Sequence, residues 1–145
     1  MKSNSQSAEQ PSRILHTMIR VSDLERSVAF YRDALSMVEK RREDYPEGQF
    51  TLSFLGYGDE TQGAVLELTY NYGENEYALG TGFGHIAVSV ADIYAACERL
   101  AAKGVTITRP PGPMAHIATN GQRDIIAFVS DPDGYQIELI SSEEH

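Results

Sequence analysis

Two histidines and two glutamates stand at matching places in the two halves of this 145-residue chain. His16 is followed by Glu67 late in the first half, and His85 is followed at nearly the same spacing by Glu138. Imidazole nitrogens and carboxylate oxygens suit a divalent metal ion, and two carboxylates balance the charge of the cation. Each of the four interrupts a stretch rich in Ile, Val and Leu, which is costly for a polar group without a partner. We therefore expect all four to bind one metal ion.

The elements that must position these residues also occur twice. Apolar periodicity predicts a strand at 15–21, a helix at 23–36, and strands at 50–55 and 64–70. After a link at 71–84 the order restarts with a strand at 85–90, a helix at 92–103, and strands at 105–108, 124–129 and 135–140. Each helix begins at an aspartate that follows its histidine by the same number of residues. The sequence therefore predicts an α+β fold of two tandem βαβββ modules, at about 14–71 and 84–142, within one domain at 14–142.

Alternation along a strand decides which side chains share a face with the predicted ligands. His16 shares its face with Met18 and Arg20. Glu67 shares its face with Thr69 and, if the strand continues, with Asn71. If the two modules form curved sheets that face a common cleft, the imidazoles and carboxylates converge. A single strand histidine is more often structural and a single glutamate is more often solvated, so the metal hypothesis depends on the quartet.

Composition limits the classes of partner. The chain is 41% hydrophobic and 23% charged, and no apolar run reaches the roughly 18 residues that a membrane span needs. Twelve basic and 21 acidic side chains give a net charge of −9, which repels nucleic acid and anionic lipid. We expect neither partner. Residues 1–13 are polar without an apolar core, so we expect a disordered leader and a cytoplasmic protein. The single cysteine, Cys97, is expected to be buried on its helix.

Six phrases within residues 15–140 resemble glyoxalase I of the vicinal oxygen chelate superfamily. They are LHTMIRV at 15–21, FY at 30–31, FLGYG at 54–58, ELTYN at 67–71, GHIA at 84–87 and DPDGY at 131–135. DPDG recurs throughout the superfamily and forms a turn by its local chemistry, so it says little about function by itself. The quartet together with Arg20 and Asn71 separates glyoxalase I from related enzymes.

The resemblance implies a carbon–sulfur lyase, a lactoylglutathione lyase that acts in methylglyoxal detoxification. Such an enzyme isomerises the hemithioacetal of methylglyoxal and glutathione to S-lactoylglutathione through an enediolate. The implied metal ligands are His16, Glu67, His85 and Glu138. Glu138 is the implied principal base and Glu67 serves the opposite face of the substrate, although the reverse order does not contradict the sequence. The implied cofactor is one divalent ion per site, with nickel or cobalt favoured and zinc possible.

The resemblance also implies a homodimer whose sites are shared between subunits, with Arg20 and Asn71 on the glutathione moiety. A guanidinium on the strand face of a metal ligand is well placed to hold a carboxylate. The lysine that holds a glutathione carboxylate in relatives is absent from the stretch Pro113–Asp124, which is longer than usual. Arg123 is the candidate replacement, and a solvated loop arginine is the alternative; His116 is interpreted as a surface residue.

Two other classes of function remain open at this point. Another metal-dependent enzyme of the superfamily could be a dioxygenase, an epimerase or a thiol transferase that acts on an antibiotic. An oxygen-activating iron site needs only two histidines and one carboxylate, so a fourth ligand at Glu67 argues against a dioxygenase. The second class is a non-enzymatic protein that sequesters a small molecule and generally has no metal ligands.

Overall fold

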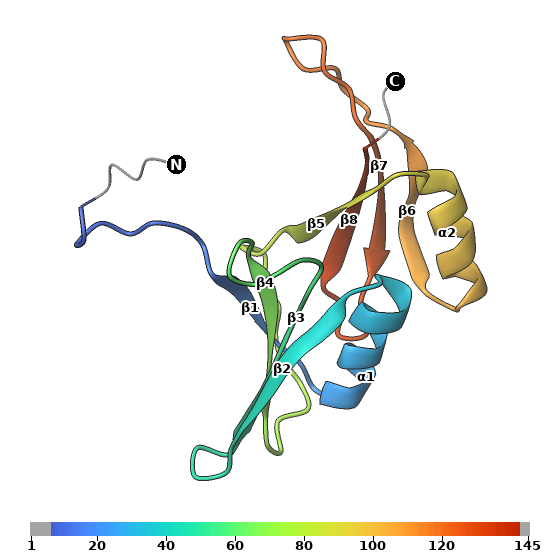
Figure 1. Cartoon of the computed structure of the whole chain (residues 1–145). Coiled ribbons are helices and arrows are strands. Elements are labelled where there is room, and N and C mark those ends of the chain that lie inside the picture. Colours follow the sequence, from blue (N-terminus) through green and yellow to red (C-terminus); the bar gives the residue numbers. More distant parts are fainter. Residues whose placement is uncertain (1–6, 143–145) are drawn as a thin grey trace.

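The computed structural model describes residues 7–142, which form two four-stranded mixed sheets with one helical segment each (Figure 1). The first sheet has the order β1 (His16–Arg20), β4 (Val65–Asn71), β3 (Phe50–Gly56) and β2 (Val38–Tyr45). The second has the order β5 (His85–Val90), β8 (Gln136–Ser141), β7 (Ile125–Ser130) and β6 (Thr106–Pro113). The first two strands in each order are parallel, and the other pairs are antiparallel. The predicted α+β fold with a repeated βαβββ module is confirmed.

Each helix begins where the sequence predicts and ends for a visible local reason. Asp23 caps α1 (Leu24–Ala29), and Asp92 caps α2 (Ile93–Ala102), each through a bond from a backbone N–H three residues on. Gly104, with φ of +86°, follows the end of α2. The predicted first helix is too long and too regular, because the chain continues after α1 as a π-helical turn, η1 (Phe30–Ala34). Ser36, in the left-handed region with φ of 63°, then turns the chain towards β2.

The structure corrects the sequence analysis at two strands. No range was predicted for β2, because its residues VEKRREDY show no apolar alternation. Strand β6 extends to Pro113, past the predicted end at 108. Its continuation contains three prolines, Pro110, Pro111 and Pro113, which an edge strand tolerates. Both corrections concern the last strand in the order of its sheet, where only one neighbour supplies backbone hydrogen bonds.

One core cluster joins the helical faces of both modules. It contains Val28 and Tyr31 from the first helical segment, Cys97 and Leu100 from α2, and Leu68 among the strand residues. The prediction that Cys97 is buried is confirmed, since its exposed fraction is 4%. Alternate residues of a strand point to opposite faces of its sheet. In each sheet, one face therefore enters this core and the other face points away from it.

A polar network fixes the two modules against each other on the core side. The Tyr31 hydroxyl donates to the Asp131 carboxylate at 2.6 Å, and the backbone N–H groups of Asp133 and Tyr135 donate to its other oxygen. Burial raises the pKa of the Asp131 carboxyl. The Ser22 hydroxyl also donates to Asp133, so the turn between β7 and β8 is bonded to the chain segment that enters α1.

The predicted leader falls partly outside the described residues, which exclude 1–6. Within residues 7–13, the Gln10 N–H donates to the Ser7 carbonyl, and Arg13 donates to the Glu60 carbonyl at 3.2 Å. Disorder of the leader therefore stays a prediction. Among residues 7–142, no helix has both the length and the apolar character for crossing a bilayer.

Candidate metal centre

The first predicted pair of ligands is assembled by neighbouring parallel strands. β1 carries His16 and β4 carries Glu67, with Val65 opposite His16 in the register. The imidazole Nε2 lies 2.7 Å from the carboxylate Oε1. Glu67 is only 8% exposed, and the Thr69 hydroxyl donates to its second oxygen at 3.3 Å. The pair is therefore preorganised, with one polar partner on the far side of the carboxylate.

The second pair repeats this geometry in the second module. His85 Nε2 lies 3.0 Å from Glu138 Oε1, across the parallel strands β5 and β8. In both modules a phenylalanine approaches the imidazole edge-on: Phe54 at 5.8 Å from His16, and Phe128 at 5.2 Å from His85. Neither ring was predicted from the sequence to contact a histidine. They lie opposite the two glutamates in the strand registers, and sequence spacing alone does not show that register.

The two pairs do not meet within one chain. Among residues 7–142 no group of three or more His, Cys, Asp or Glu side chains is placed to hold a metal ion. The reason is the shared core, which occupies the helical faces of both sheets and directs the two donor faces outward. The two sheets of one chain therefore do not turn their donor faces toward a common cleft. One chain supplies two separate pairs of donors.

The donor chemistry of each pair fits a divalent metal ion. Each supplies one imidazole nitrogen and one carboxylate oxygen on an outward face, and the exposed fractions of the histidine side chains are 39% and 41%. Two protein donors are fewer than the three or four that hold catalytic metal ions. One pair alone therefore provides too few protein donors for a catalytic metal ion.

Two of the three predicted substrate residues lie on the same two strands as the first pair. Arg20 ends β1 on the face of His16, and its carbonyl accepts a 2.7 Å bond from the Tyr135 hydroxyl. Asn71 ends β4 on the face of Glu67, and its amide donates to the Tyr77 hydroxyl at 3.2 Å. The donor face of the first sheet thus carries a cationic and an amide group at the far ends of the two ligand strands.

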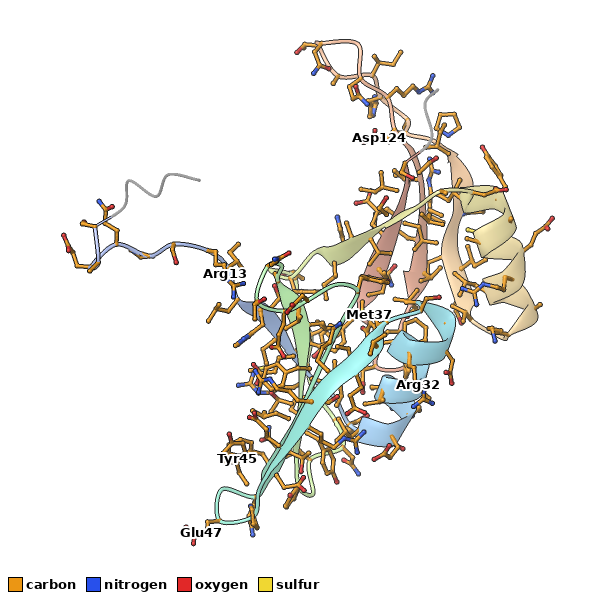
Figure 2. The ribbon with its side chains drawn as sticks, viewed as in Figure 1. Arg13, Arg32, Met37, Tyr45, Glu47 and Asp124 are labelled. Carbon is orange, nitrogen blue, oxygen red and sulfur yellow. The ribbon has the colours of Figure 1, made fainter. Side chains whose placement is uncertain are left out.

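Arg123 lies elsewhere in the chain. It belongs to the segment between β6 and β7 that projects beyond the second sheet in Figure 1, and its Nε donates to the Met114 carbonyl at 2.8 Å. Asp124, labelled in Figure 2, marks where this segment joins β7. Arg20 and Asn71 belong to the first sheet, so the structure does not bring all three predicted residues together in one chain.

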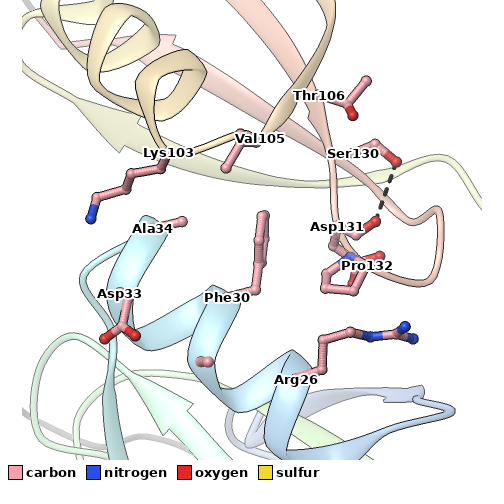
Figure 3. Close-up of a pocket in the computed structure, with 12 residues that line it drawn as sticks. Arg26, Phe30, Asp33, Ala34, Lys103, Val105, Thr106, Ser130, Asp131 and Pro132 are labelled. Atoms are coloured by element: carbon pink, nitrogen blue, oxygen red, sulfur yellow. Dashed lines mark hydrogen bonds between the residues drawn. The ribbon is translucent and has the colours of Figure 1, made fainter.

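The cavity in Figure 3 is separate from the donor pairs. It has a volume of about 600 Å³ and lies between the first helical segment and the turns that precede β6 and β8. Arg26, Phe30, Lys103 and Asp131 are among its lining residues. None of the predicted ligands or substrate residues lines it, so cavity size does not locate the chemistry in this chain.

Comparisons with known proteins identify the family of the chain. Residues 13–139 match the family model described as Glyoxalase/Bleomycin resistance protein/Dioxygenase superfamily. The chain belongs to this superfamily. Within the superfamily it is 55% identical to a probable lactoylglutathione lyase of Synechocystis sp., over 89% of this chain and 95% of the relative. It is 54% identical to a lactoylglutathione lyase of Neisseria meningitidis, over 90% of this chain and 91% of the relative.

Solved structures of superfamily members show the same likeness. Glyoxalase I from Zea mays superposes with a TM-score of 0.82 and 43% identity over 91% of this chain, which spans 45% of the maize chain. The trypanothione-dependent glyoxalase I of Leishmania major superposes with a TM-score of 0.76 and 44% identity, over 90% of this chain and 87% of that one. The expected resemblance to glyoxalase I is confirmed, and so is the expectation of a carbon–sulfur lyase.

Proposed function

We infer that the chain is a lactoylglutathione lyase that isomerises the hemithioacetal of methylglyoxal and glutathione to S-lactoylglutathione. Two relatives named for this activity are 55% and 54% identical over nearly their whole lengths. The observation that carries the inference is the pair of equivalent His–Glu couples, at 2.7 and 3.0 Å, on outward strand faces. A protein that only sequesters a small molecule has no use for two such couples.

We propose that His16, Glu67, His85 and Glu138 hold one divalent ion per site in a homodimer. Enzymes of this family depend in general on a metal ion. The first-module pair of one subunit and the second-module pair of the other supply four donors, and two-fold symmetry then generates two equivalent sites. The outward direction of both donor faces supports this arrangement, since a single chain leaves each pair with two donors.

The protein residues have distinct tasks in the isomerisation. A divalent ion held by these donors supplies Lewis acidity that stabilises negative charge on the substrate oxygens. The Glu138 carboxylate accepts the proton from C1 of the hemithioacetal, and a proton is returned at C2, so the step is a net isomerisation without an external oxidant. Glu67, on the partner's half of the site, serves the opposite face of the substrate.

Substrate recognition is assigned to polar groups beside the first donor pair. Arg20 pairs with a glutathione carboxylate, and the Asn71 amide bonds to the same moiety. Arg123, on the segment between β6 and β7, is assigned the task of the missing lysine. Nickel or cobalt is the proposed metal, and the location is proposed to be cytoplasmic.

The function is tested by metal removal and replacement. The protein is stripped with a chelator, and thioester absorbance from methylglyoxal and glutathione is followed after addition of nickel, cobalt or zinc. We expect no turnover in the stripped protein, recovery with nickel or cobalt, and less with zinc. Failure of all three metals to restore thioester formation would refute the function.

A matched pair of variants distinguishes the loss of a metal ligand from the loss of a histidine that binds no metal. His85→Ala is expected to lose both bound metal and turnover. His116→Ala, an exposed histidine of the segment between β6 and β7, is expected to keep both. Full metal occupancy in His85→Ala contradicts the ligand assignment, even if turnover falls.

A further inference from the structure

A row of three side chains crosses the first sheet beside His16. Glu67 of β4 lies opposite Phe54 of β3, and Phe54 lies opposite Arg41 of β2. Directly opposed residues point to the same face of a sheet, so all three share the outward donor face. The row ends at the side chain of Arg41, for which the proposed reaction has no task so far.

Arg41 covers the aromatic ring of this row. Its guanidinium carbon lies 3.7 Å from the centroid of the Phe54 ring, a cation–π geometry. The same ring makes a T-shaped contact with the imidazole of His16, with an interplanar angle of 70°. Phe54 is only 4% exposed, although it points away from the core. The arginine thus covers the ring, and the ring forms a wall against the imidazole.

Two carboxylates hold the guanidinium in place. Arg41 Nε donates to a Glu60 oxygen at 3.2 Å, and its Nη1 is bonded to Glu43. A long side chain fixed at both edges of its guanidinium loses its freedom to swing off the ring. The two negative charges also offset the arginine charge, which would otherwise repel a cation at the neighbouring donor pair.

The second module has the same row without the cover. Glu138 lies opposite Phe128, and Phe128 lies opposite Arg109. The guanidinium of Arg109 donates instead to main-chain carbonyls. These belong to Pro110, Gly112 and Pro113 of β6 and to Ile126 of the neighbouring strand β7. Phe128 is correspondingly only half-buried. The arginine cover is therefore present on the phenylalanine beside His16 and absent from the phenylalanine beside His85.

We propose that Arg41 is a positioning residue for His16. By pinning the Phe54 ring against the imidazole, it keeps Nε2 directed at the metal side of Glu67 before any ion binds. This rests on the proposed metal site, since it describes how one ligand of that site is oriented. Residues that orient metal ligands typically change metal affinity by about 10–100-fold when they are replaced.

Direct titration with cobalt tests the proposal without recourse to turnover. The dissociation constant of Co²⁺ is measured by chelator competition for the wild-type protein, Arg41→Ala and Arg42→Ala. Arg42 is the matched control, because it neighbours Arg41 on β2 but bonds to Glu25 and Glu39. We expect about tenfold weaker binding for Arg41→Ala and no weakening for Arg42→Ala. The sign is decisive, since loss of a positive charge alone would tighten binding of a cation.

The proton NMR spectrum of the metal-free protein provides an independent readout. The ring proton signals of His16 should shift in Arg41→Ala as the Phe54 ring loosens, whereas those of His85 should not. Cobalt affinity equal to wild type, or weaker binding with unchanged His16 signals, overturns the proposal. If the alanine variant does not fold, Arg41→Lys is titrated in its place. We expect an intermediate loss of cobalt affinity, and wild-type affinity would contradict the proposal. Absence of cobalt binding in the wild type would instead refute the proposed metal site.

Discussion

Mixed dimers of two inactive variants test whether the site is shared between subunits. His16→Ala removes a donor from the first-module pair, and His85→Ala removes one from the second-module pair. In a dimer of either variant alone, both sites lack one histidine. In a mixed dimer, one site lacks both histidines, while the other combines the intact first module of one chain with the intact second module of its partner.

The recovery follows from counting sites. Random exchange of equal amounts of the two variants makes about half of all dimers mixed. Each mixed dimer has one intact site out of two. Activity per chain should therefore return to about a quarter of the wild-type value. Thioester formation is measured before and after exchange, and bound nickel is measured in the same samples. Both quantities should rise together from near zero.

The matched control combines two lesions of the same module. His16→Ala mixed with Glu67→Ala restores no site, because each site of the mixed dimer still contains one damaged first module. Recovery in this control would show an effect other than site sharing. Persistent inactivity of the His16→Ala and His85→Ala mixture, with subunit exchange verified by a mass label, would refute the shared site, and so would recovery without bound metal.

Three further variants probe the base, the substrate contact and the contact between modules. Glu138→Gln keeps an oxygen ligand without basicity, so turnover should fall by about 10²–10⁴ while metal affinity falls less; near-normal turnover, with Glu67→Gln inactive, would reverse the two roles. Arg20→Ala should raise KM about 10–100-fold through loss of a charge-assisted bond, with little change in metal content. Tyr31→Phe should lower the free energy of unfolding by about 1–3 kcal/mol at neutral pH. The bond from Tyr31 lowers the pKa of Asp131, which burial raises, so the loss should grow as pH rises through that pKa; thermal unfolding at acid and neutral pH measures it, and an equal loss at both would contradict it.

Apolar periodicity identified the elements whose two faces differ in polarity. The strand at 85–90 and the aspartate caps of both helices were placed correctly, since one face of each element enters the core. Strand β2 was not predicted because neither of its faces is apolar. On one face Arg41 covers Phe54, and on the other Arg42 pairs with Glu25 of α1. Ion pairs thus replace apolar contacts in β2, and a periodicity argument based on apolar residues cannot detect that substitution.

The condition of a common cleft is not met within one chain, although alternation assigned the donors to the strand faces that lie away from the core. Each helix must bury its apolar stripe, and the apolar face of its own sheet is the surface available for this. Both stripes enter one core, as Val28 and Leu100 show, so the donor faces of His16 and His85 must point outward on opposite sides of that core. A chain with two one-sided sheets and one shared core therefore cannot close a site between its own donor faces. The proposed four-donor metal site therefore requires a second copy of the chain, which lays the opposite module against each donor pair.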